Sequence, residues 1–253
     1  MTAGRITRLV LVERSRRILG LIGFAILFVL AGFVARLLVG GSGHVEMGQL
    51  YQIGGYPMVS ALLLLGWLLG RYPIIATLVL VTGWFSADRA AGYARLYSVR
   101  PVSFLRLYGL RLLTLLAVSF VMSAVLMPTF DVLMLGEWTG AAVFVLIGSY
   151  VLLYGSLTAF LSLFTRGEGW LALGLGMSAM IWDAMRRAGS LDQAPRIVRQ
   201  IVSFILPPQG PLFRIETAFG EIQPIPWIDV GYVAAYSAIL LLATAVFIVD
   251  REV

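Results

Sequence analysis

Cysteine and lysine are absent from the 253 residues, and histidine occurs once, at His44. Without cysteine the chain has no disulfide framework and no thiolate nucleophile. A single histidine cannot form a multi-histidine metal site. The missing lysine excludes the phosphate-binding loop of P-loop ATPases, and the G-x-S-x-G and H-E-x-x-H motifs are absent as well. We therefore expect no enzyme activity, metal or cofactor in this chain.

Charge is also scarce, since only 13% of the residues are charged while 60% are hydrophobic. A soluble domain of this length could not bury so much apolar surface. About 20 apolar residues in a helix cross a hydrocarbon core of about 30 Å. The sequence predicts an all-α integral membrane protein, with residues 1–253 forming one transmembrane domain. Its six predicted spans cover residues 18–39, 58–85, 104–127, 139–164, 169–185 and 229–249.

The distribution of arginine predicts the orientation of the spans. Twelve arginines fall on the side that holds both chain ends, and five fall in the long connection on the other side. Cytoplasmic loops carry the excess of positive charge, so both termini are predicted to be cytoplasmic in a bacterial plasma membrane. The same charges leave no reason to expect a nucleic-acid partner, because they lie where membrane topology requires them.

Two segments outside the spans have helical spacing of apolar residues. The N-terminal stretch Thr2–Arg17 places Ile6, Leu9 and Val10 near one face, which is typical of an interfacial helix or of a basic topology anchor. Between residues 186 and 229, an amphipathic stripe is expected before the break at Pro207 and Pro208. The stripe consists of Ile197, Val198, Ile201, Val202 and Ile205.

The connection between the second and third predicted spans contains residues that end one helix and begin another. A short helix is expected from about Asp88 to Val99, because Pro101 disfavours helical backbone at Arg100. Ser103 can cap the helix that enters the third span. We call residues 88–103 the elbow; it would present a charged knob on the cytoplasmic side. Ordinary positive-inside anchoring with a helix stop is the alternative interpretation.

The elbow resembles that of the permease subunits of ABC transporters of the type-2 exporter class. In that family an acidic residue leaves the second span, a glycine follows about one turn later, and an Arg-Pro-Val/Leu-Ser element opens the third span. The corresponding positions here are Asp88, Gly92 and Arg100-Pro101-Val102-Ser103. The six-span layout, the basic N-terminus and the long outer segment before the last span are similar too.

This resemblance implies a coupling helix that sits in a cleft of a separate cytoplasmic ATPase, which binds Mg-ATP. The contact residues would be Asp88, Arg89, Gly92, Arg95, Arg100 and Pro101. A second permease chain, identical or different, would complete the transporter within the lipid bilayer. The helices before the last span would then dip into the outer leaflet and shape an exit gate; shielding of the bundle from lipid is the alternative.

Two ionisable residues fall within predicted spans, Arg71 in the second and Asp183 near the outer end of the fifth. A charge at this depth is costly and marks a candidate pathway residue, and Asp183 is the nearest partner by type for Arg71. Alternatively, the chain breaks between Gly70 and Pro73 so that Arg71 reaches the interface, and Asp183 is exposed there.

Three classes of function fit these features. A permease would bind an ATPase through the elbow. A structural or assembly subunit of a larger membrane complex would keep the spans but show no nucleotide-linked change. A membrane-embedded enzyme would need polar groups that converge at one depth, and only Arg71 and Asp183 are available.

Overall fold

Helices account for all the regular structure in the described part of the computed structural model. This part comprises residues 3–38, 60, 64, 66–92, 103–135, 138, 140–191, 195–221 and 223–249. Within it, four helices are long and apolar enough to cross a membrane. These are α2 (Ser15–Leu38), α7 (Phe104–Leu135), α8 (Ala142–Leu161) and α12 (Trp227–Val249). Even the 20 residues of α8 extend about 30 Å, the thickness of the hydrocarbon core.

The other two predicted spans differ from the expectation. In the range 58–85, α4 covers only Tyr72–Val81, and a turn at Arg71 precedes it with Pro73 in its first turn. Proline lacks the backbone N–H of a helix interior and is tolerated at a helix start, which explains this break. In the range 169–185, α9 (Glu168–Arg187) is helical but is not among the four spanning candidates. Six spans are therefore not established.

The centre of the bundle is α8, which packs against α4, α7, α9, α11 and α12. Its buried hydroxyls are satisfied within the helix. Ser149 donates to the carbonyl of Val145 and Thr158 to that of Tyr154. By contrast, α2 and α12 leave most of their apolar side chains uncovered. Five elements thus surround an enclosed helix, while α2 and α12 present a surface suited to lipid.

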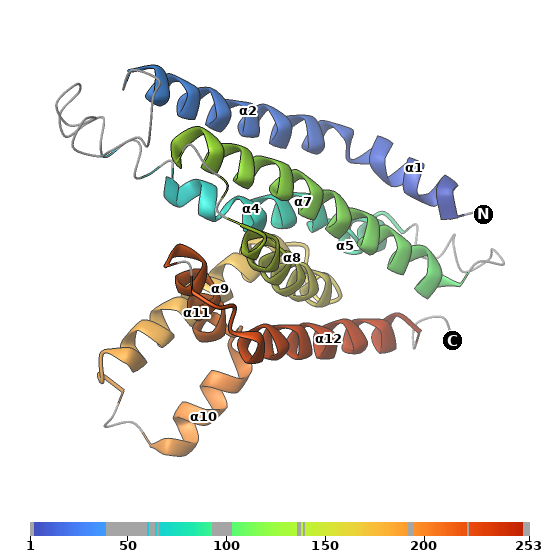
Figure 1. The fold of residues 1–253 in the computed structure, drawn as a ribbon. Helices are drawn as coiled ribbons and strands as arrows, with labels where there is room; N and C mark the ends of the chain where they lie inside the picture. Colours follow the sequence, from blue (N-terminus) through green and yellow to red (C-terminus); the bar gives the residue numbers. More distant parts are fainter. Residues whose placement is uncertain are drawn as a thin grey trace.

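The chain-terminal ends of the first and last described helices lie at the same end of the bundle. The start of α1 (Ala3–Glu13) and the end of α12 lie at this end, which we call the terminal end (Figure 1). Helices α10 (Arg196–Ile205) and α11 (Gln209–Gly220) lie toward the opposite end. The predicted N-terminal helix is present as α1, and its buried side chains Ile6 and Val10 lie where α1 packs against α7.

Helix α5 (Ser86–Ala90) leads into the elbow, and residues 93–99 of the helix predicted from Asp88 to Val99 lie outside the described residues. Helix α5 does not continue past Gly92, because Gly92 has φ +74°, in the left-handed region that favours glycine. The later elbow residues Arg95, Arg100 and Pro101 lie outside the described residues. The predicted cap is confirmed, since the side-chain oxygen of Ser103 accepts the backbone N–H of Arg106 at 3.2 Å.

The amphipathic helix predicted before Pro207 is confirmed as α10. None of its side chains is buried, and an apolar stripe is open along its length. The exposed members of this stripe are Ile197, Val198, Ile201, Phe204 and Ile205. A short extended link through Pro207 and Pro208 separates α10 from α11, whose buried face includes Leu212 and Ile215.

Candidate functional site

Polar side chains from several helices meet around α5 at the terminal end. We call Glu13, Arg14, Asp88, Arg111 and Glu168 the elbow cluster. Nη1 of Arg111 lies 2.7 Å from Oδ2 of Asp88, and Nη2 lies 2.6 Å from Oε2 of Glu13. The Arg111 side chain is only 8% exposed, so its charge is neutralised within the chain. This guanidinium joins α7 to both α1 and α5.

Glu168, at the start of α9, stabilises the turn between α4 and α5 through hydrogen bonds. One of its carboxylate oxygens accepts the backbone N–H of Gly83 at 2.6 Å and the hydroxyl of Ser86 at 2.7 Å. Gly83 has φ +78°, a conformation that allows this turn and that disfavours other residues. Because Glu168 is fully buried, these bonds fix the position of α9 against the base of the elbow.

Arginines from the junction of α1 and α2 hold the last turn of α4. Arg14 donates to the carbonyl of Thr82 at 2.9 Å, and Arg17 donates to the same oxygen at 2.5 Å. Burial lowers the pKa of Arg14 to about 10, so the group still carries its charge at neutral pH. Cations are favourable at a helix C-terminus, where carbonyl groups lack partners within the helix.

Two of the predicted ATPase-contact residues form bonds inside the chain. Asp88 pairs with Arg111 and accepts the hydroxyl of Tyr108 at 3.1 Å, and its side chain is 14% exposed. Arg89 donates to the carbonyl of Leu163, just after α8. These contacts anchor α5 to the bundle, and Gly92 ends it; they do not test contact with another protein.

Arg71 belongs to a second polar group, nearer the opposite end. Its Nη1 lies 2.8 Å from Oε1 of Glu216 and 2.6 Å from the hydroxyl of Tyr150. Tyr150 in turn donates to the other oxygen of Glu216 at 2.9 Å. The three side chains close a triangle that ties α4, α8 and α11 together, and we call it the outer triad.

Asp183 does not pair with Arg71, contrary to the partner expected from residue type. Its carboxylate accepts a hydrogen bond from Arg186 at 2.9 Å and forms an ion pair with Arg187 at 3.1 Å. Arg71 and Asp183 nevertheless line one cavity of about 340 Å³ between α4, α8, α9 and α11, so the structure brings them together without a direct bond. The geometric reason is that α11 inserts Glu216 beside Arg71.

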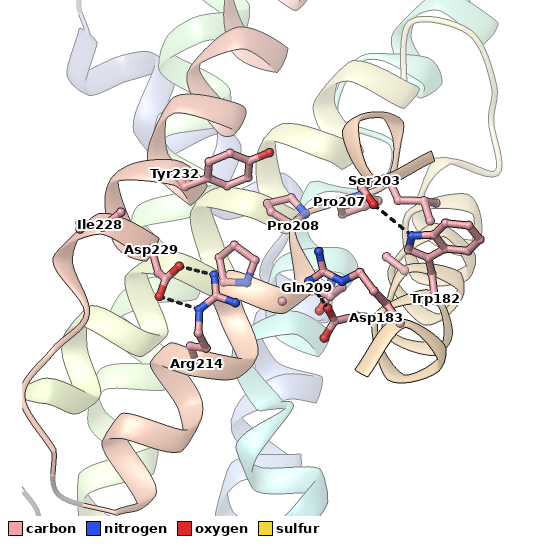
Figure 2. A pocket seen from close by; sticks show the side chains of 15 residues that line it. Trp182, Asp183, Ser203, Pro207, Pro208, Gln209, Arg214, Ile228, Asp229 and Tyr232 are labelled. Atoms are coloured by element: carbon pink, nitrogen blue, oxygen red, sulfur yellow. Dashed lines mark hydrogen bonds and ion pairs between the residues drawn. The ribbon is translucent and has the colours of Figure 1, made fainter. Parts of the chain in front are cut away.

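A second cavity of about 370 Å³ lies between α9, α10, α11 and α12 (Figure 2). We call it the α12 cavity. One wall carries Arg214, which binds Asp229 through Nε at 2.9 Å; this hydrogen bond raises the pKa of Arg214. The other carries Asp183 with Arg186. Asp183 and Gln209 line both cavities and separate them.

The sequence did not single out Glu13, Glu168 or Glu216, which pair with or position the predicted residues. The small number of charged residues could have pointed to them, because the chain has only 13 acidic residues and 19 arginines. In so apolar a chain each carboxylate is a candidate partner for a buried cation. Which arginine each one meets depends on helix packing, which the sequence pattern does not specify.

No protein-family model, curated protein or solved structure matches this chain. The four long apolar helices indicate a multi-pass membrane protein. Across the described ranges, no group of three His, Asp or Glu side chains could hold a metal ion. The arrangement instead consists of two polar groups, the elbow cluster and the outer triad, connected by the helix α4.

Proposed function

We propose that this chain is the transmembrane permease subunit of an ABC transporter of the type-2 exporter class. It would couple ATP hydrolysis by a separate ATPase to export, or to mechanical transduction, across a bacterial plasma membrane. The observation that carries the proposal is the anchorage of α5. Asp88 and Arg89 on this five-residue helix bind Arg111 in α7 and the carbonyl of Leu163 after α8.

A coupling element must move the bundle rather than bend on its own. Here the bonds of Asp88 and Arg89 are supplemented by Glu168, which holds the preceding turn. Breaking a buried ion pair leaves an uncompensated charge and costs several kcal/mol, on the order of 3–5. A push on the elbow would therefore displace α7, α9 and the loop after α8 together.

The push would also reach the opposite end of the bundle through α4. This helix starts beside the outer triad, at Arg71, and ends where Arg14 and Arg17 hold the carbonyl of Thr82. Its outer end is bonded to Glu216 of α11. In the proposal, α4 transmits elbow movement to α11, and the cavity lined by Arg71 and Asp183 forms part of the pathway.

The proposed transporter needs an ATPase, a second permease chain and membrane lipid. The ATPase is a cytoplasmic subunit that binds Mg-ATP, and this chain holds no cofactor of its own. A second permease chain and membrane lipid complete the assembly. Because Asp88 and Arg89 are engaged internally, we assign them to anchorage, and we assign the contact with the ATPase to Arg95, Arg100 and Pro101, beyond Gly92.

The test is a pull-down that uses this chain as bait for a cytoplasmic ABC ATPase. The variant Arg95→Glu with Arg100→Glu reverses two elbow charges and is expected to release the ATPase. The matched control is Arg5→Glu with Arg8→Glu, which makes the same charge change on exposed positions of α1 at the terminal end. The control should retain the ATPase.

A complex that survives elbow reversal and still transports would contradict the proposal. Equal release by both variants would show a general charge effect and would also contradict it. A structural or assembly subunit, the alternative function, predicts that neither variant affects an ATPase and that no nucleotide-linked change occurs.

A further inference from the structure

The α12 cavity exposes its arginine side chains more than its carboxylates. Two ion pairs line it, Asp183 with Arg186 and Arg214 with Asp229. The arginine side chains are 50% and 54% exposed, whereas their carboxylate partners are only 9% and 14% exposed. Asp183 also pairs with Arg187, which lines the neighbouring cavity rather than this one. A ligand that enters this cavity meets guanidinium groups first.

Both arginines have donors to spare. Arg214 uses Nε and Nη2 to bind Asp229, and Arg186 uses Nη2 to bind Asp183. A guanidinium group has five N–H donors, so several remain on each side chain. Arginine pairs with phosphate through parallel, charge-assisted hydrogen bonds, and this geometry favours it over other residues at phosphate sites.

The cavity lies at the start of a helix that is long and apolar enough to span the membrane. Its α12 residues are Ile228, Asp229 and Tyr232, all within the first two turns of a spanning helix of 23 residues. Such a helix extends about 35 Å, about one turn more than a hydrocarbon core of about 30 Å, so its ends lie near the headgroups. The neighbouring α10 has an exposed apolar stripe, which suits a helix that lies along the membrane surface.

We propose that the α12 cavity binds a phosphate group, with Arg186 and Arg214 as its ligands, and that an anionic phospholipid supplies it. The cavity volume of about 370 Å³ is at the small end of ligand pockets and fits a headgroup rather than a whole lipid. This site goes beyond the permease proposal and does not depend on it, because it follows from the cavity alone.

The experiment follows one position inside the cavity. The chain has no cysteine, so Tyr232→Cys gives a single reactive thiol beside the two arginines. Its maleimide labelling rate is measured in detergent with phosphatidylglycerol, with diacylglycerol of the same acyl chains, and with inorganic phosphate. Ser190→Cys, exposed and outside the lining of this cavity, is the reference thiol. Phosphatidylglycerol should slow labelling at 232 and not at 190.

Two arginine variants then test the ligands. Arg186→Gln leaves Asp183 paired with Arg187, and Arg214→Gln with Asp229→Asn removes both members of the other pair. Neither variant leaves a carboxylate without a partner. Each should raise the half-protecting concentration of phosphatidylglycerol about tenfold, the effect of losing one charge-assisted hydrogen bond. Arg36→Gln, which removes one charge from the last turn of α2, should leave it unchanged.

Protection by diacylglycerol equal to that by phosphatidylglycerol would overturn the proposal, as would full protection in both arginine variants. Absence of protection by any of the three compounds would overturn it too. Protection by inorganic phosphate alone would retain the phosphate site and reject the lipid as its source. None of these results depends on an ATPase, so the permease proposal stands or falls separately.

Discussion

Asp88 of α5 and Arg111 of α7 lie 2.7 Å apart, and both side chains are largely shielded from solvent. This pair connects the short helix at the terminal end to the longest helix of the bundle. Arg111 also binds Glu13, whose side chain is 41% exposed. The two carboxylates therefore differ in burial while sharing one cation, and this difference yields a direct test.

Asp88→Asn should lower stability more than Glu13→Gln does. A buried charged hydrogen-bond partner is worth about 1–3 kcal/mol, whereas an exposed one contributes less than about 1 kcal/mol. Unfolding by denaturant in detergent, followed by circular dichroism, measures the difference. Equal losses for the two variants would show that the Asp88–Arg111 pair does not anchor α5.

Close packing of α9 on α8 depends on a missing side chain at Gly176. A Cβ atom built there would lie 2.4 Å from the hydroxyl oxygen of Tyr154, which is held by Gln209 at 3.0 Å. Gly176→Ala should destabilise the protein by about 1–3 kcal/mol through overpacking. Gly174→Ala, two residues away and facing open space, should be neutral or stabilising. Thermal unfolding of both variants provides the comparison.

The outer triad should hold α11 against the bundle. Glu216→Gln removes the charge that pairs with Arg71 and is expected to increase hydrogen exchange across α11, because that contact joins α11 to α4. The control is Glu221→Gln, just past the end of α11, where the carboxylate is exposed and bonds only to Gln223 among the described residues. Unchanged exchange in Glu216→Gln would mean that apolar packing alone holds α11.

The predicted orientation can be read from single thiols in intact cells. Gly4→Cys lies on exposed α1 at the terminal end, and Ser190→Cys follows α9. The arginine distribution predicts that a membrane-impermeant maleimide labels position 190 and reaches position 4 only after lysis. The reverse pattern would invert the topology and place the elbow outside the cytoplasm.

The apolar runs predicted helix ranges well where burial and length agree. The range 229–249 became α12 with a start only two residues earlier, and the outer stripe became α10. The helix boundaries were predicted less well where a single proline or glycine sets the backbone conformation. Pro73 interrupts the second apolar run, and Gly92, with its positive φ, follows the five residues of α5.

The sequence alone could not predict which charged residues pair with one another. Arg71 meets Glu216, which lies 145 residues further along the chain, rather than Asp183. Residue type identified the cost of a charge within a span, and therefore the need for a partner. Only the packing of α11 beside α4 and α8 decides which carboxylate supplies it.

The central claim is that ATP hydrolysis in a partner moves this bundle through the elbow. Met180→Cys places the only thiol of the chain in the cavity that Arg71 and Asp183 line. With the ATPase present, its maleimide labelling rate is compared without nucleotide and with Mg-ATP and vanadate. We expect Mg-ATP and vanadate to change this labelling rate several-fold, and we expect Asp88→Asn to abolish the change. A labelling rate that stays the same in both states, in a complex that hydrolyses ATP, would contradict it.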